Sequence, residues 1–139
     1  MTTYFAKMEK DGDGWLVTFP DVPEAITGGA TEDEARANAA DALEVALLTY
    51  VLDNRALPPA IAQSGLTVTV SAAVAVKIAF IEAFRASGLT RVEVASRMNK
   101  QEGEVRRMLD PYHNTKLHTL ETGLRVLGKQ LVVSVQDAA

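Results

Sequence analysis

Acidic and histidine side chains are the first candidates for chemistry, and their spacing argues against a metal site. Asp11 and Asp13 resemble the start of a calcium-binding loop, but Trp15 occupies the next ligand position and no glutamate stands at the twelfth. His113 and His118 are five positions apart, a poor fit to the helical spacing of a metal-binding pair. The chain has no cysteine, and no nucleophile stands beside a base in any recognisable pattern. We therefore expect no metal, no cofactor and no enzymatic activity.

Arginine and glutamine side chains within residues 89–109 indicate a different chemistry, which is contact with DNA. This stretch has the pattern of two short helices joined by a tight turn. Ala95 stands where the first helix needs a small residue, and Val105 where the second helix fills the core between the two. Asn99 stands at the turn, where a left-handed backbone favours glycine and tolerates asparagine.

The ends and the buried side of this helix pair are also predicted. Thr90 and Glu93 have the spacing of a capping box at the first helix, and Gln101 opens the second. Three further side chains complete the buried side: Val94, Met98 and Met108.

The opposite face of the second helix carries the candidate DNA-reading residues. Arginine makes paired hydrogen bonds to guanine and also contacts phosphate, whereas glutamine suits adenine. Glu102 and Glu104 weaken this hypothesis, because phosphates repel carboxylates. The alternative is a helical hairpin inside another helical core, with solvated arginines. The predicted DNA-binding residues are Lys100, Gln101, Glu102, Gly103, Arg106, Arg107 and Lys116.

Charge is distributed unevenly over the 139 residues, whose net charge is −4. Residues 1–60 carry four basic and eleven acidic side chains, whereas residues 61–139 carry ten basic and seven acidic ones. An acidic front half suits a basic protein partner, and a mildly basic back half can approach DNA. No apolar run has the length of a signal peptide or of a membrane span, so we expect a soluble, cytoplasmic protein.

The elements that must position these residues begin with a β-hairpin. Apolar and polar residues alternate over residues 4–9 and 15–19, and the loop over residues 10–14 contains two glycines. Residues 24–27 are short enough for an edge strand. A long helix follows to about residue 54, with Thr31 and Glu34 as its capping box. Its second apolar flank consists of Val45, Leu48 and Leu52, which we expect to complete the core, with contact to another subunit as the alternative.

The prolines after residue 57 mark a boundary between two predicted domains, residues 1–57 and 66–139, with residues 58–65 as linker. The second domain is predicted to open with a strand over residues 66–70 and a helix over 73–87. After the helix pair come a helix over 117–127 and a last strand over 130–135. This last strand needs a neighbour, either the strand over 66–70 or the same strand of a second subunit.

The front half resembles the HicB antitoxin family. The resemblance rests on Asp13-Gly14-Trp15, Phe19-Pro20-Asp21-Val22-Pro23, Thr27-Gly28-Gly29-Ala30-Thr31 and Glu34-Ala35-Arg36-Ala37-Asn38-Ala39. The back half is similar to the subgroup that ends in a repressor-type helix-turn-helix. This chain departs from the usual repressor pattern in Asn99 at the turn and in Gly103 within the recognition helix, which costs about 1 kcal/mol relative to alanine.

The resemblance implies an α+β fold in which a partial ribonuclease-H-like sheet with a long helix precedes an all-α helix-turn-helix domain with flanking strands. It further implies a type II antitoxin that binds HicA, a small basic toxin that cleaves mRNA, and that represses its own operon. Asp11, Asp13 and Asp21 lie in predicted turns rather than on adjacent strands, so we expect no two-metal nuclease site. The expected toxin-binding residues are Trp15, Phe19, Asp21, Glu24 and Thr27.

Two functions therefore remain open. The first is the antitoxin; the second is a stand-alone helix-turn-helix regulator whose front domain senses a signal or dimerises. Both require at least a homodimer, because symmetric operator half-sites need a symmetric protein.

Overall fold

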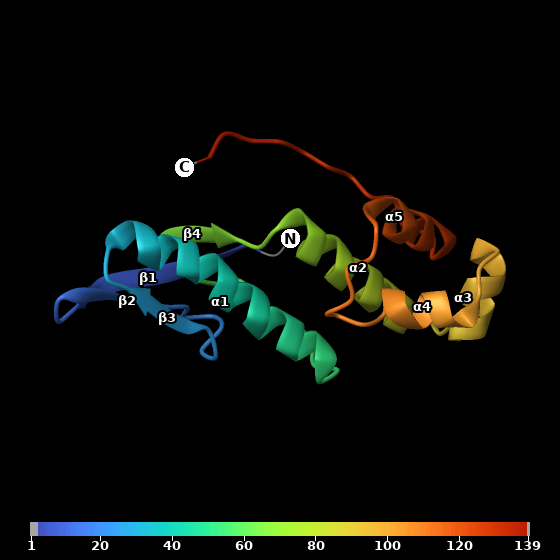
Figure 1. The fold of residues 1–139 in the computed structure, drawn as a ribbon, viewed down its shortest axis with the longest axis horizontal. Helices are drawn as coiled ribbons and strands as arrows, with labels where there is room; N and C mark the ends of the chain where they lie inside the picture. The colour runs from blue at the N-terminus through green and yellow to red at the C-terminus, as the bar shows by residue number, and fades with distance from the viewer. Residues whose placement is uncertain (1–2, 139) are drawn as a thin grey trace. The chain divides into compact units, whose positions relative to one another are not determined.

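The N-terminal hairpin forms as its alternating pattern predicts. The computed structural model describes residues 3–138, and Figure 1 labels their elements. β1 (Thr3–Asp11) pairs antiparallel with β2 (Gly14–Thr18), with Asp11 opposite Gly14. In the turn between them Gly12 has a φ of 59°, a conformation that glycine adopts without a Cβ clash. The hairpin is thus confirmed, and its first strand extends to Asp11.

Two further strands complete an antiparallel sheet whose order is β3-β2-β1-β4. β3 (Ile26–Gly29) pairs with β2 and forms one edge, which confirms the predicted edge strand with its bounds shifted by two residues. β4 (Leu66–Thr69) pairs with β1 and forms the other edge, with Val68 opposite Tyr4.

The position of β4 corrects the predicted domain boundary. This strand was expected to open the second domain or to pair with the last strand, but it belongs to the first of two units, unit 1 (Met1–Ala75) and unit 2 (Val76–Ala139). The alternation of residues 66–69 fits any open strand edge. The edge of β1 lets Val68 be buried on the same face as Tyr4.

α1 (Glu32–Leu52) covers one face of the sheet (Figure 1). Thr31 caps it, since the Thr31 hydroxyl accepts a hydrogen bond of 3.1 Å from the Glu34 backbone N–H. Small residues bring the helix and the sheet close together, and a Cβ on Gly29 would lie 2.6 Å from the backbone nitrogen of Ala35. The apolar core of unit 1 includes Tyr4, Ala6, Val17, Phe19, Ala35, Ala39, Leu43, Leu47, Val51 and Val68.

The second apolar flank of α1 only partly joins this core. Leu48 is buried, but Val45 and Leu52 are 61% and 55% exposed. The assignment of the whole flank to the core was therefore wrong for these two residues. They lie on the side of the helix that turns away from the buried residues of the sheet.

Unit 2 is helical. Its elements are most of α2 (Ala72–Ser87), then α3 (Arg91–Met98), α4 (Glu102–Met108) and α5 (Leu117–Val126). These bounds confirm the predicted helices to within about two residues. The buried apolar side chains come from all four helices: Ile78, Phe80, Ile81, Val94, Val105, Met108, Leu120 and Leu124.

The predicted last strand does not form in the single chain. Residues 129–138 are neither helix nor strand, and Figure 1 draws them as an extended trace. Val132, Val133 and Val135 are at least 71% exposed. β4, the partner expected within the chain, is part of the unit 1 sheet, whereas residues 129–138 belong to unit 2.

The described residues thus form a mixed α+β protein with one four-stranded antiparallel sheet and five helices, which confirms the predicted fold class at this level. Within residues 3–138, none of the helices has the length and apolar character needed to span a bilayer.

Candidate nucleic-acid surface and partner groove

The turn between α3 and α4 has the geometry that the sequence predicts. The Thr90 hydroxyl accepts a 3.1 Å hydrogen bond from the Glu93 backbone N–H and caps α3. Asn99 ends that helix with φ 57° and ψ 47°, which is the left-handed conformation. The Lys100 N–H then donates to the Ala95 carbonyl at 2.9 Å, the bond of a Schellman-type helix end. The chain therefore passes from α3 to α4 through three residues, 99–101.

The buried side of this helix pair is confirmed as well. Val94 and Val105 are completely buried, and Met108 is 1% exposed. α5 approaches them closely at Gly123, where an added Cβ would lie 2.8 Å from the Met108 methyl carbon and 2.5 Å from a Phe80 ring carbon. The position of α4 is thus fixed by close packing, and its other face is left to solvent.

The predicted DNA-contacting residues lie mainly on that outer face. Gln101, Arg106 and Arg107 are exposed on or just before α4, whereas Glu102 and Gly103 are half-buried. Lys100 is exposed in the turn, and Lys116 is exposed at the N-terminus of α5. The structure therefore brings together six of these residues on one helix and its leading turn, with Lys116 on the following helix.

The two glutamates that weaken the DNA hypothesis are both paired with cations. Glu102 contacts Arg91 of α3 at 3.1 Å and Arg106 at 3.8 Å. Glu104 contacts Lys100 at 3.7 Å. Within residues 3–138, Arg97 and Arg107 take part in none of the ion pairs. The acidic charge on α4 is thus compensated within the helix pair, which leaves arginine as the dominant outward charge.

Lys77 of α2 holds the C-terminal end of α4, a role that sequence reasoning missed. Its side chain is only 4% exposed and donates hydrogen bonds to the Met108 carbonyl at 2.9 Å and to the Thr115 hydroxyl at 2.7 Å. A cation at the negative end of a helix is favourable. Burial lowers the pKa of Lys77 to about 8, although the charge of Asp110 acts in the opposite direction. The available signal was a single lysine between Val76 and Ile78 in an apolar helix.

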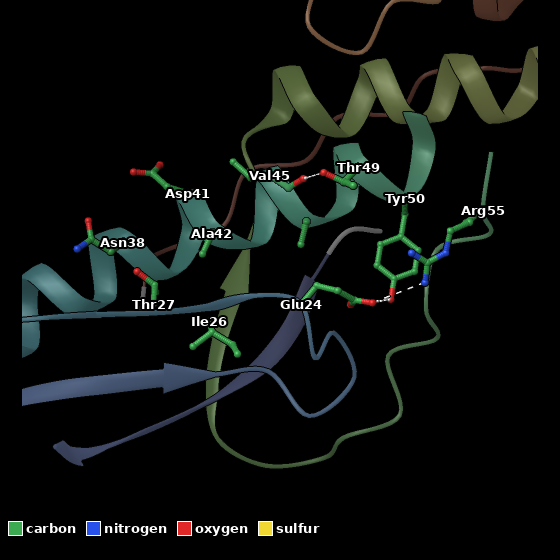
Figure 2. Close-up of a pocket in the computed structure, with 11 residues that line it drawn as sticks. Glu24, Ile26, Thr27, Asn38, Asp41, Ala42, Val45, Thr49, Tyr50 and Arg55 are labelled. Atoms are coloured by element: carbon green, nitrogen blue, oxygen red, sulfur yellow. Dashed lines mark hydrogen bonds and ion pairs between the residues drawn. The ribbon is translucent and has the colours of Figure 1, made fainter. Parts of the chain in front are cut away.

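Unit 1 carries a groove of about 410 Å³ between β3 and α1. Figure 2 shows it, with Thr27 and Asn38 toward one end and Glu24, Tyr50 and Arg55 at the other. The Asn38 side-chain amide donates a 2.8 Å hydrogen bond to the Gly28 carbonyl and so ties the helix to the sheet edge. The residues that line the groove are Glu24, Ile26, Thr27, Asn38, Asp41, Ala42, Val45, Ala46, Thr49, Tyr50 and Arg55.

A polar cluster closes one end of this groove. The Tyr50 hydroxyl donates to both carboxylate oxygens of Glu24, at 2.8 and 2.7 Å. Arg55 lies over the Tyr50 ring, 4.0 Å from its centroid, and 3.6 Å from the Glu24 carboxylate. The hydrogen bond from Tyr50 lowers the pKa of Glu24, and the same bond raises the pKa of Tyr50. Glu24 is therefore held as an anion.

The structure separates the five predicted toxin-binding residues. Glu24 and Thr27 line the groove, but Trp15 lies apart from it, with the Lys10 ammonium 5.0 Å from its ring. Asp21 accepts hydrogen bonds from the backbone of Ile61 and Ala62, which anchors the segment before β4. Phe19 is 2% exposed and belongs to the core. Its assignment as a contact residue is corrected, because Phe19 directly follows β2 and is buried like Val17 two positions before it.

None of the described residues forms a cluster of three or more metal-binding side chains. His113 instead shares a 3.0 Å hydrogen bond with the Thr115 hydroxyl, next to Lys77.

The fold and these two surfaces define a two-unit protein with an acidic sheet-and-helix unit and a helical unit that carries exposed arginines. Comparison with known proteins identifies the class. Residues 3–79 match the family described as HicB_like antitoxin of bacterial toxin-antitoxin system.

Similarity to individual relatives extends over both units. Antitoxin HicB 2 of Photorhabdus laumondii subsp. laumondii is 37% identical over 128 residues, which span 92% of each chain. Antitoxin HicB 1 of the same organism is 40% identical over 88% of this chain and 79% of its own length. Antitoxin HicB of Escherichia coli strain K12 is 36% identical over 85% of this chain and 87% of its own. The chain therefore belongs to the HicB-like antitoxin family and is not an enzyme; the family implies a toxin as its partner.

Proposed function

We propose that this antitoxin neutralises a HicA-type mRNA interferase toxin through unit 1 and represses its own operon through unit 2. In this proposal unit 1 has a partial ribonuclease-H-like fold, and α3 and α4 form a repressor-type helix-turn-helix. α4 is the recognition helix, which enters the major groove of operator DNA.

The observation that supports DNA binding best is the outer face of α4. It presents Gln101, Arg106 and Arg107, while the nearby carboxylates of Glu102 and Glu104 are occupied by intramolecular ion pairs. The left-handed turn at Asn99 joins α3 to α4 through three residues, the arrangement of a helix-turn-helix motif.

Toxin binding is supported by family membership and by charge. The four basic and eleven acidic side chains of unit 1 give it a net charge of −7, which attracts a basic protein and speeds its association. The same charge repels nucleic acid, so unit 1 is a poor candidate for the DNA-binding unit.

A homodimer or a higher homo-oligomer is part of the proposal. Val132, Val133 and Val135 are exposed, and a two-stranded ribbon with the same segment of a second copy would pair the backbone groups of this segment. Such a dimer would present two copies of α4 to symmetric half-sites.

The DNA-binding part is tested by measuring operator affinity for Arg106→Ala and Arg107→Ala. Each change is expected to cost about 1–3 kcal/mol if the arginine reads a base, with a smaller dependence on salt if it contacts phosphate. Arg125→Ala is the matched control, because Arg125 is exposed on α5 and removal of its charge leaves α4 unaltered. Unchanged affinity in both α4 variants would rule out α4 as the recognition helix.

The toxin-binding part is tested by expressing the gene with its neighbouring reading frames and determining by native mass spectrometry what co-purifies with the tagged chain. A small basic protein in defined ratio is expected, and its growth inhibition should disappear when this chain is co-expressed. A chain that emerges alone, as a homo-oligomer, would favour the stand-alone regulator instead.

A further inference from the structure

The groove between β3 and α1 contains apolar side chains that the fold leaves uncovered. Ile26 of β3 and Val45 of α1 line it and are 62% and 61% exposed. Leu52 follows Val45 by two turns on the same side of α1 and is 55% exposed. Large apolar side chains scattered singly on a surface need no explanation, but Ile26 and Val45 share one groove with a polar rim, the pattern of an interaction site.

The sheet edge beside this groove is unsuited to an added strand. β3 has four residues, and the Gly28 carbonyl already accepts the amide of Asn38 at 2.8 Å. A partner strand therefore finds no continuous row of free backbone groups. The groove is instead open to a side chain, which would rest on Ile26 and Val45 and cover the exposed faces of both.

The polar groups around the groove favour a cationic partner. Asp41 is exposed on the α1 wall, and within residues 3–138 it forms none of the ion pairs. At the opposite end the Glu24 carboxylate is held by Tyr50 and paired with Arg55 at 3.6 Å, so Asp41 is the carboxylate left to attract a cation. Both carboxylates belong to a unit whose net charge is −7.

We infer that this groove seats the toxin, and that it takes an apolar side chain flanked by a lysine or arginine residue that meets Asp41. This inference rests on the proposed function, because it assigns a place to the toxin of that proposal. Charge complementarity favours a basic protein over a second copy of the chain, whose own groove would bring acidic groups against acidic groups.

The test uses the full chain co-expressed with the toxin, and compares Val45→Lys and Asp41→Lys with Ile61→Lys. Each groove variant sets a lysine against the cationic partner, so toxin affinity is expected to fall at least about tenfold. Ile61 belongs to the same unit, is 72% exposed and lies outside the groove, so its variant should bind as the wild type does. Val45 and Ile61 are both exposed in the wild type. Thermal unfolding of each variant without toxin reports whether the fold is retained.

The salt dependence of binding provides a second measurement. Asp41→Asn removes one attractive charge and should reduce the loss of affinity between low and high salt without a large change at high salt.

Unchanged toxin affinity for Val45→Lys and Asp41→Lys would show that the toxin binds elsewhere on the chain. The proposed neutralisation of the toxin would still stand in that case. If Val45→Lys instead alters the oligomeric state of the toxin-free chain, a second copy occupies the groove and the inference is wrong. A wild-type chain that binds no toxin would refute the proposed function itself.

Discussion

Unit 1 and unit 2 differ both in how they are held together and in the charge that they show to a partner. Unit 1 depends on strand pairs between distant residues, such as Thr3 with Thr69, whereas unit 2 consists of helices that follow one another closely. Residues 1–75 carry a net charge of −7 and residues 76–139 a net charge of +3. A net charge of −4 for the whole chain hides this contrast. The proposed function uses this difference, since a basic toxin and acidic DNA would each meet a surface of opposite charge that has its own core.

The largest expected effect comes from truncating a buried side chain in the core of one unit while the core of the other unit stays intact. Phe80 is completely buried in unit 2, so Phe80→Ala should lower the free energy of unfolding of that unit by about 3–5 kcal/mol. Operator binding should be lost at physiological temperature, while toxin binding persists. Calorimetry of the full chain, followed by both binding assays, measures this separation.

Leu43→Ala is the corresponding variant in the core of unit 1. Leu43 is completely buried in unit 1, and its truncation should cost about 2–5 kcal/mol there. It should weaken toxin binding and spare operator binding by the isolated dimer. Loss of both activities in each variant would show that the two units unfold together.

A second prediction concerns the close approach of α5 in unit 2. Gly123→Ala places a Cβ within 2.5 Å of the Phe80 ring and 2.8 Å of Met108, and both neighbours belong to the packed core. Overpacking of this kind costs about 1–3 kcal/mol. Urea unfolding measures the loss, and Gly128→Ala makes a useful comparison, because its backbone conformation is strained by a side chain although the space around it is open.

The sequence predicted elements and caps that depend on neighbouring residues. Thr31, Thr90 and Asn99 have local partners, and each takes the predicted role. The sequence did not predict which distant segments pair with one another. Residues 66–69 have an alternation that fits any open edge, so their pairing with β1 depended on which edge was free.

The two candidate sites differ in the same way, because one follows from a local pattern and the other from contacts between distant residues. The face of α4 follows from helical periodicity alone, so its exposed residues were predictable. The groove in unit 1 joins Glu24, Tyr50 and Arg55, which only the folded sheet and helix bring within hydrogen-bonding or ion-pair distance. Lys77 was missed for a related reason, because the Met108 carbonyl that accepts its hydrogen bond lies 31 positions away on another helix.

A third prediction uses pH to separate the units. The pKa of Lys77 is lowered to about 8 from an ordinary value of 10.5, so between these values the unfolded chain binds more protons than the folded one. The stability of unit 2 should therefore rise from pH 8 to pH 10.5 relative to a variant without this group. Lys77→Met preserves the apolar stem and removes the charge. The difference in melting temperature between wild type and variant, measured from pH 7 to pH 10, reports the effect.

A different result would contradict this prediction. Parallel curves for wild type and Lys77→Met would show that the ammonium group keeps its ordinary pKa despite its burial. In unit 1 the corresponding group is Glu24, whose pKa is lowered by Tyr50. Its contribution should be present above the unfolded pKa and should be lost as the pH falls, so the two units respond at opposite ends of the pH scale.

The smallest expected effects come from two asparagines with left-handed backbones, one in each unit. Asn54 follows α1 with a φ of 58°, and Asn99 ends α3 with a φ of 57°. Alanine at either position should cost about 1–2 kcal/mol, because its Cβ crowds the following carbonyl in this conformation, and glycine should restore or exceed the wild-type stability.

The two alanine variants are expected to lose similar stability but to differ in their effect on operator binding. The turn at Asn99 sets the direction of α4, so Asn99→Ala should weaken operator binding more than its loss of stability explains, whereas Asn54→Ala should leave operator binding unchanged. Urea midpoints and operator affinities measured on the same four variants decide this, and equal effects of the two alanine variants on the operator would show that the turn has no special part in placing α4.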